Sequence, residues 1–317
     1  MQTQLVEIIN RIIPIIVLIL VGKWFQARNF IQENSILDIK KLVVNFALPA
    51  VLFLSFLTVD FQLEYFWFLP VILFYCVLLY LLGVLLRKTL SNTGRYFPFL
   101  TTGFEYGMLG VSLFGAAYGL DQIGKIAIVD LGQETFIWFI YVALLMRERD
   151  GDAQPGQLLK MFATSPVILA ILSGLILNFL GLADLLADWP VTGGLLVALE
   201  WVAGLTIPLI LLVVGYGLQF DFNELAFAAR VILIRLVINI PAALLLNHFF
   251  VRGWMGLEKG FEAAVFTLLI LPPPFILTLF MNQEEKQAIH RVDSTLTLHT
   301  VVTIIVFVIY YSLNPVI

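Results

Sequence analysis

The stretch LILPPPF, residues 269–275, decides what kind of fold this chain has. It lies in an almost wholly apolar segment that runs from Phe261 to Met281. Three consecutive prolines cannot continue a helix, because each removes a backbone donor and clashes with the preceding turn, at about 3 kcal/mol or more. In hydrocarbon the freed carbonyl groups have no water to bond. The stretch therefore predicts a helix that is broken at membrane depth, where its open backbone groups line a hydrated cavity.

The composition of the whole chain agrees with a membrane setting. Of its 317 residues, 61% are hydrophobic and 13% are charged, with a mean hydropathy of +0.98. These values exclude an ordinary soluble domain and are typical of a polytopic helical membrane protein. The N-terminal MQTQLVEIINR has no basic region and no small-residue cleavage site, so the first apolar segment is expected to be retained as a span.

Ten apolar segments are long enough to cross about 30 Å of hydrocarbon, which needs about 20 residues. They cover residues 8–27, 37–58, 64–86, 97–119, 123–146, 161–181, 194–219, 226–250, 259–281 and 292–313. The segment RERDGDAQPGQLLK at 147–160 is charged and contains Pro and Gly. We expect it to be a cytoplasmic loop that separates a first half, 1–146, from a second half, 161–317.

The Lys and Arg residues set the expected orientation, because cytoplasmic connections are enriched in them. With the N-terminus outside, the inner connections hold Lys23, Arg28, Lys40, Lys41, Arg87, Lys88, Arg95, Arg147, Arg149, Lys160, Arg230, Lys286 and Arg291, and the outer ones hold Arg11, Lys125, Arg252 and Lys259. Arg235 lies inside a span, where it is expected to pair with an acid or to reach the inner surface. We therefore expect both termini to be extracytoplasmic, in the cell membrane.

Five spans on each side of the loop have opposite orientation, which predicts an inverted repeat. Helix-breaking residues occur in the same order in the two halves. Pro14 and Gly22 correspond to Pro166 and Gly174, Pro49 corresponds to Pro208, and the glycine-containing GMLGVSLFG (107–115) corresponds to the prolines at 272–274. Prolines are tolerated in membrane helices, so their shared order carries more weight than any single match. These correspondences predict two broken helices, with breaks at 107–112 and 272–274, that cross near the midplane. The N-terminal ends of their half-helices are expected to face a ligand.

Several segments together resemble a known family. They are KLVVNFALPAVLF (41–53), GMLGVSLFGAAYG (107–119), IAIVDLGQETFIWF (126–139), GLTIPLILLVVGYGLQF (204–220), PPPFILTLFMN (272–282) and VDSTLTLHTVVTI (292–304). In order and spacing they resemble the auxin efflux carrier family, whose bacterial branch includes malate and malonate permeases. The resemblance implies ten helices in a five-plus-five inverted repeat, a crossover of helices four and nine, and transport of organic anions, often by a homodimer. The wider architecture resembles that of sodium/bile-acid symporters.

The sequence departs from the family pattern at the expected crossover. Where the fourth helix of the family usually has Asn and Pro, this chain has Glu105 and Ser112. In the fifth helix Asp130 matches the pattern, whereas Gln133 replaces the usual Asn. A carboxylate at the crossover would repel an anionic substrate unless it were protonated or paired with a cation.

Intramembrane ionisable groups are functional candidates by default. Glu105 is interpreted as a proton or cation site beside the substrate, with a structural neutral acid as the alternative. Asp130, Gln133 and Glu134 occupy positions i, i+3 and i+4, so one helix face carries all three. That face is either a polar wall of the transport pathway or a polar seam between helices.

The remaining candidate site residues lie at or near the expected helix breaks and kinks. Asn45 precedes Pro49 by four residues and is either a site residue, as the resemblance implies, or a partner for the kinked backbone. Gly110 and Ser112 are expected to form the fourth-helix break, with Ser112 capping the second half-helix and helix packing as the competing role of the glycine. Pro272, Pro273 and Pro274 form the other break. We expect His299 to be a structural packing residue.

These observations predict a secondary transporter of a small organic anion, such as a carboxylate, with the substrate at the crossover and the lipid bilayer around it. One alternative is a proton- or cation-coupled carrier of a neutral or zwitterionic solute, with a proton or sodium ion as co-substrate. Another is a transport-inactive ligand sensor. The sequence contains no HExxH, GxxxxGK[ST] or GxSxG motif and no Cys/His metal set, and its basic residues are scattered, so we expect no enzyme, cofactor or nucleic-acid partner.

Overall fold

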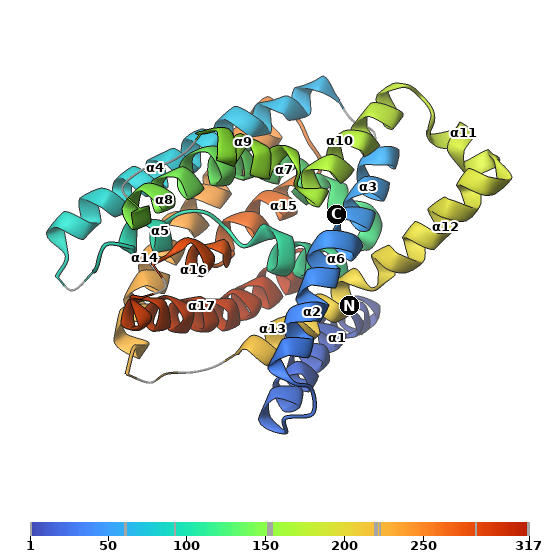
Figure 1. The fold of residues 1–317 in the computed structure, drawn as a ribbon. Helices are drawn as coiled ribbons and strands as arrows, with labels where there is room; N and C mark the ends of the chain where they lie inside the picture. Colours follow the sequence, from blue (N-terminus) through green and yellow to red (C-terminus); the bar gives the residue numbers. More distant parts are fainter. Residues whose placement is uncertain are drawn as a thin grey trace.

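The computed structural model describes residues 2–59, 62–91, 93–150, 155–218, 221, 223–282 and 284–315. Within these ranges all regular structure is helical (Figure 1). Seven helical segments are long and apolar enough to cross a membrane, namely Ile9–Ala27, Glu33–Thr58, Leu63–Thr89, Leu120–Arg149, Pro190–Gly217, Leu225–Trp254 and Lys286–Leu313. Pro166–Phe179 is a shorter apolar helix. The prediction of an all-helical polytopic membrane protein is confirmed, while the number of ten spans stays a prediction.

The helices follow the predicted apolar segments closely. Their bounds are α1 Gln2–Ala27, α2 Glu33–Leu42, α3 Leu48–Thr58, α4 Phe68–Thr89, α5 Phe97–Thr101, α6 Val111–Tyr118, α7 Ile123–Phe136, α8 Val142–Asp150, α9 Pro155–Ala163, α10 Pro166–Phe179, α11 Ala183–Asp188, α12 Pro190–Gly204, α13 Thr206–Gly217, α14 Leu225–Leu245, α15 Lys259–Ile270, α16 Ile276–Phe280 and α17 Lys286–Leu313. Short 3₁₀ turns precede α4 and α7, and π-helical turns lie at Val43–Ala47, Tyr106–Gly110, Ile137–Tyr141 and Leu246–Trp254.

Two of the predicted spans are interrupted in the middle. The segment 259–281 consists of α15, an extended stretch at the three prolines, and α16, because prolines supply no backbone donor to continue the helix. The segment 97–119 consists of α5, an extended stretch, a π-helical turn and α6. Its break lies at Thr102–Glu105 rather than at the predicted 107–112. The reason is local: Gly103 has a positive φ of 69°, whereas Gly107 and Gly110 remain inside the π-helical turn.

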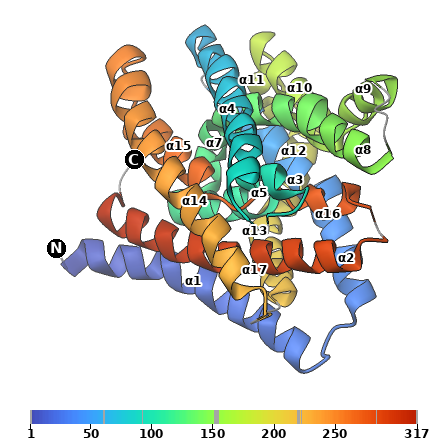
Figure 2. The same cartoon turned by 90° about the vertical axis from the view of Figure 1, so that its left-hand side faces the viewer.

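The long helices form two packed groups. The first, on the right in Figure 1, joins α1 to α13 and α3 to α10 and α12. The second joins α4 to α5 and α7, and α14 to α15 and α17, and Figure 2 shows α14 crossing α17. In the first group α1 and α13 approach backbone to backbone, since a side chain at Gly215 would come within 2.0 Å of the Ile19 carbonyl oxygen. Small residues allow such close contact between membrane helices.

The polar segment 147–160 is more helical than predicted. Helix α8 continues to Asp150, with Arg147 and Arg149 in its last turn, where basic side chains complement the helix dipole. Helix α9 begins at Pro155, a residue suited to the first helical position. Residues 151–154 lie outside the described ranges. The described residues of the expected loop are therefore largely helical, and the division into halves stays a prediction.

The predicted orientation can be tested by labelling. We expect a cysteine at Gly156, an exposed position with open space around it, to resist an impermeant maleimide in intact cells and to react after permeabilisation. A cysteine at exposed Asp184 should react in intact cells. The native Cys76 is buried and need not be removed, and the parent chain serves as the unlabelled control. Labelling of the Gly156 variant in intact cells would contradict the orientation.

Candidate functional site

Glu105 joins the two broken helices. It lies just before the π-helical turn at Tyr106–Gly110, and its side chain is buried. Its Oε1 accepts a hydrogen bond of 3.2 Å from the backbone N–H of Met108, and its Oε2 accepts one of 2.6 Å from the backbone N–H of Phe275, just before α16. Each broken span has a second half-helix after its break: the π-helical turn with α6 in one span, and α16 in the other. One carboxylate thus binds the N-terminal ends of both second half-helices. Free N–H groups at such ends attract negative charge.

The backbones of the two breaks are also in direct contact. The N–H of Glu105 donates to the carbonyl oxygen of Pro272 at 2.8 Å. A side chain at Gly103 would come within 2.8 Å of Pro274 Cγ, and one at Gly110 within 2.8 Å of Leu271 Cδ1. The glycines therefore let the proline segment lie against the other break. All three prolines at 272–274 are buried.

Arg235 of α14 binds the C-terminal ends of the first half-helices, α5 and α15, at the same crossing. Its side chain is 1% exposed. It donates to the carbonyl oxygens of Leu100 at 3.2 Å, Gly103 at 2.7 Å and Leu271 at 2.9 Å, and its guanidinium lies 5.2 Å from the centre of the Phe104 ring. These carbonyls lie at the C-terminal ends of α5 and α15, where the helix dipole favours a cation.

The role expected for Arg235 was wrong. Among the described residues no carboxylate forms an ion pair with it, and it does not reach a surface. Three backbone carbonyl groups stabilise its charge by hydrogen bonds instead, an arrangement that depends on the fold and that sequence spacing does not indicate.

Asp130 and Gln133 lie behind the first break. Both side chains are 1% exposed. Gln133 Nε2 donates to Asp130 Oδ1 at 2.8 Å and to the carbonyl oxygen of Phe104 at 2.9 Å. Within the described part of the chain, Asp130 Oδ2 and Gln133 Oε1 have no hydrogen-bond partner. Two buried acceptors without donors are the kind of group that a proton or a cation would satisfy.

Glu134 faces a different neighbour. Its Oε2 accepts a hydrogen bond of 2.8 Å from Trp138 Nε1 of the same helical segment. The three residues predicted to share one face therefore divide into a buried pair, Asp130 and Gln133, which contacts the break, and a half-buried acid, which does not.

The other candidates form no hydrogen bond with Glu105 or Arg235 among the described residues. Asn45 is exposed and donates to the carbonyl oxygen of Lys41 at 2.8 Å, one turn earlier in its own helix. Ser112 is buried, but its hydroxyl donates to the Leu109 carbonyl oxygen at 3.0 Å, so the predicted cap is wrong and Glu105 takes that position. His299 is buried, as a packing residue would be, yet neither ring nitrogen has a partner among the described residues.

A cavity of about 530 Å³ reaches the breaks from one side. It lies between α2 and α13 on one wall and α16 and α17 on the other, and Met108 and Phe275 border it. The same two residues supply the N–H groups that Glu105 binds. A small solute in this cavity would therefore contact the two residues whose N–H groups hold the Glu105 carboxylate.

The charged residues that line this cavity have both signs. Lys40 of α2 and Asp293 of α17 contribute to its walls, and Asp221 accepts from His290 at 2.5 Å at its edge. The backbone N–H of Asn223, and then His290, lower the pKa of Asp221 below its ordinary value, so this group remains an anion near neutral pH. The cavity can hold a polar solute but does not present uniform positive charge.

Comparison with known proteins supports one functional class. No family model matches the chain. A protein of Methanothermobacter thermautotrophicus named "Uncharacterized transporter" is 22% identical over 312 residues, which cover 93% of this chain and 94% of that protein. Together with the membrane-spanning helices, this similarity supports a transporter in general. Neither the similarity nor the helices specify the family or the substrate.

Proposed function

We propose that the protein is a proton-coupled secondary transporter of a small organic carboxylate, with its substrate site where the two broken helices touch. The observation that carries the proposal is the position of Glu105, whose carboxylate occupies the N–H groups of both second half-helices. Such paired half-helix ends are the usual anion site of transporters with discontinuous helices. Here a carboxylate of the protein already fills that position.

The mechanism follows from competition for these N–H groups. When Glu105 takes up a proton, it binds them less well, because a neutral carboxylic acid is a weaker acceptor than a carboxylate. A substrate carboxylate in the cavity then replaces it at Met108 and Phe275. One proton and one negative charge enter together, so the site gains no net charge. Arg235 keeps its three carbonyl bonds throughout and holds the first half-helices in place.

The architecture proposed for this process has ten spans, with a five-plus-five inverted repeat across residues 1–146 and 161–317. The interrupted segments 97–119 and 259–281 are its fourth and ninth spans and cross near the midplane. The group that contains α4, α7, α14, α15 and α17 moves against the group that contains α1, α3, α10, α12 and α13. With both termini outside, the cavity beside Lys40 opens to the cytoplasm. A homodimer in the bilayer follows from the family resemblance.

One observation favours a second candidate substrate class. The cavity contains both Lys40 and Asp293, so a zwitterionic solute would find a partner for each of its charges. In that case Glu105 stays ionised and stabilises the amino group of the solute, with a proton or a sodium ion as coupling ion. A transport-inactive sensor would bind the same ligands without moving them.

A ligand screen distinguishes these possibilities. We expect carboxylates to raise the melting temperature of the purified protein, and to raise it more at acidic than at mildly alkaline pH, because binding requires the protonated form of Glu105. Dicarboxylates, monocarboxylates and amino acids should be compared at both pH values, followed by flux in proteoliposomes.

The outcomes separate cleanly. Stabilisation by amino acids alone would contradict the carboxylate substrate. Stabilisation by carboxylates that is equal at both pH values would contradict the proton coupling. Binding without flux would identify a sensor.

A further inference from the structure

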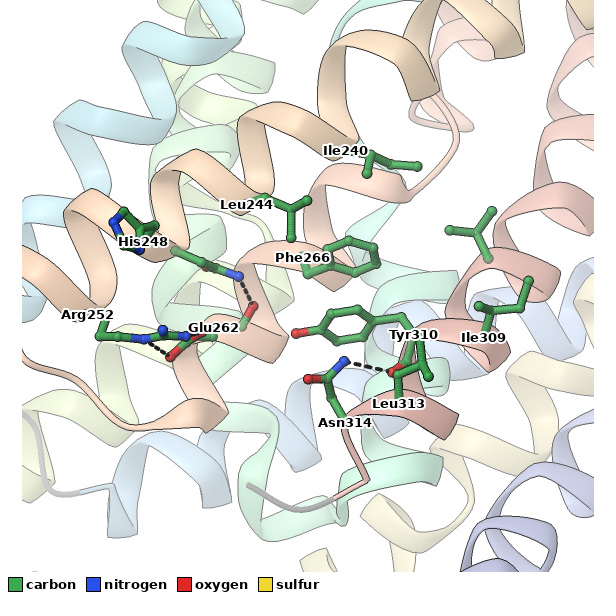
Figure 3. A pocket seen from close by; sticks show the side chains of 12 residues that line it. Ile240, Leu244, His248, Arg252, Glu262, Phe266, Ile309, Tyr310, Leu313 and Asn314 are labelled. Carbon is green, nitrogen blue, oxygen red and sulfur yellow. Dashed lines mark hydrogen bonds and ion pairs between the residues drawn. The ribbon is translucent and has the colours of Figure 1, made fainter.

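A second cavity lies on a different part of the molecule. It has a volume of about 490 Å³ and is lined by α14 with the following π-helical turn, by α15 and by α17 (Figure 3). None of its lining residues borders the cavity beside Glu105. The proposed transport mechanism does not use it.

The cavity has a polar end and an apolar end. At the polar end Arg252 forms a two-pronged ion pair with Glu262, with Nε and Nη2 donating at 3.0 and 2.6 Å. At the apolar end Ile240, Leu244 and Val306 form the walls. Figure 3 shows the stacked rings of Phe266 and Tyr310 between the two ends, and their centres are 3.7 Å apart. This arrangement suits an amphiphilic molecule rather than a small ion.

The polar end contains one unmet acceptor. Asn247 is 5% exposed and borders the cavity. Its Nδ2 donates to the backbone carbonyl oxygen of Glu262 at 2.8 Å, and this bond fixes the amide orientation because a carbonyl oxygen only accepts. Its Oδ1 then has no partner among the described residues. A buried acceptor of this kind calls for a donor from a ligand.

The arginine at the polar end is already paired. The guanidinium of Arg252 binds both carboxylate oxygens of Glu262, so it offers no unpaired charge to an anion. His248 and Tyr310 also border the cavity, but the buried lining group that lacks a partner among the described residues is the Asn247 oxygen, which is an acceptor. The preferred head group therefore carries N–H or O–H donors.

The position of the cavity points to the bilayer as the source of the ligand. Its polar end lies where α14 with its π-helical turn ends, where α15 begins and where α17 ends. Trp254 is exposed there and packs against Trp67, with ring centres 5.1 Å apart, and tryptophans are enriched at the membrane interface. Around the apolar end the large side chains of Ile305 and Ile309 are exposed, as they are on a surface that faces acyl chains.

We propose that this cavity binds one membrane lipid. An acyl chain lies along Ile240, Leu244 and Val306, and a head group with N–H or O–H donors binds Asn247 Oδ1 and Glu262. Phosphatidylethanolamine and phosphatidylglycerol both have such donors, whereas the trimethylated head group of phosphatidylcholine has none. A cavity of this volume lies within the range of about 300–1,000 Å³ that ligand pockets occupy, so it holds part of one lipid.

The test measures lipid binding to the full-length protein in detergent by native mass spectrometry, using the three lipids with identical acyl chains. We expect phosphatidylethanolamine and phosphatidylglycerol to bind the unchanged protein about tenfold more tightly than phosphatidylcholine, since one hydrogen bond to a buried acceptor has about that effect. Val306→Phe fills the apolar end and should abolish binding of all three. Ile305→Phe changes the neighbouring exposed position outside the cavity and should bind like the unchanged protein.

A third variant isolates the head-group contact. Asn247→Leu removes the acceptor and should equalise the three affinities. Equal affinities in the unchanged protein would overturn the proposal, as would binding by Val306→Phe at the level of Ile305→Phe. A preference for phosphatidylglycerol alone would also overturn it, because it would indicate charge rather than donor chemistry. None of these results depends on transport.

Discussion

Replacing Arg235 with alanine should cause the largest loss of stability of any single substitution in the crossing of the broken helices. The variant leaves the carbonyl groups of Leu100, Gly103 and Leu271 buried without donors. Each unmet buried polar group costs about 1–3 kcal/mol, so the total is several kcal/mol. Typical folded proteins have only about 5–15 kcal/mol of unfolding free energy. We expect a large fall in the melting temperature in detergent and loss of the monodisperse peak.

Two other variants serve as comparisons for the melting temperature of Arg235→Ala. Arg235→Lys keeps the charge, but an ammonium group cannot reproduce the planar fork that reaches three carbonyls, so its melting temperature should lie between those of the unchanged protein and Arg235→Ala. Arg230→Ala, earlier on the same helix, removes an exposed arginine whose guanidinium makes one bond of 3.3 Å to the Ser91 carbonyl oxygen, and should change stability little. If Arg235→Ala melts like Arg230→Ala, the crossing does not depend on this cation.

The second large effect is expected from Glu105→Gln. The amide keeps one acceptor oxygen but replaces the other with an NH₂ group, which only donates, so one of the two N–H groups of Met108 and Phe275 loses its acceptor. The protein should still fold, with a moderate loss of stability of about 1.5–3 kcal/mol for one lost charge-assisted bond. Because glutamine cannot take up the coupling proton, uptake by proteoliposomes should lose most of its dependence on pH. Glu105→Ala should be less stable than Glu105→Gln, since both N–H groups then lose their acceptor.

The matched control for this variant is Glu134→Gln. Glu134 is another intramembrane acid, but it bonds Trp138 and not the half-helix ends. Its replacement should leave the pH profile of uptake close to that of the unchanged protein. An unchanged pH profile in Glu105→Gln would make Glu105 a structural acid and would remove the proposed proton coupling, whatever the substrate proves to be.

The parts of the structure that the sequence predicted are those governed by local rules. Proline cannot donate a backbone hydrogen bond, so the break at Pro272–Pro274 follows directly from the residues. The long helices are also predictable locally, because a membrane-spanning helix needs about 20 consecutive apolar residues. The position of the first break was less predictable, because glycine is compatible with helix as well as with extended chain. Gly107 and Gly110 lie in a helical turn, whereas Gly103 has a positive φ that other residues rarely adopt.

The contacts between distant segments could not be predicted in this way. Glu105 was identified as important from its depth in a span, yet nothing in the sequence indicates that Phe275, 170 positions away, supplies its second donor. The position of Arg235 beside both breaks depends on how α14 packs in the folded chain. Asn45 lies in a motif that resembles a site segment while its side chain bonds its own helix, so its role at the site stays a prediction.

The close approach of α1 and α13 through Gly22 and Gly215 has a mechanical consequence. A side chain at either position would collide with backbone of the opposite helix, at 2.1 Å for Gly22 and 2.0 Å for Gly215, so the two backbones are in close contact along this seam. Helix α13 also forms one wall of the cavity, through Val213 and Val214. In the proposed transport motion we therefore expect α1 and α13 to move as one unit, and the wall that carries Phe275 to move relative to them.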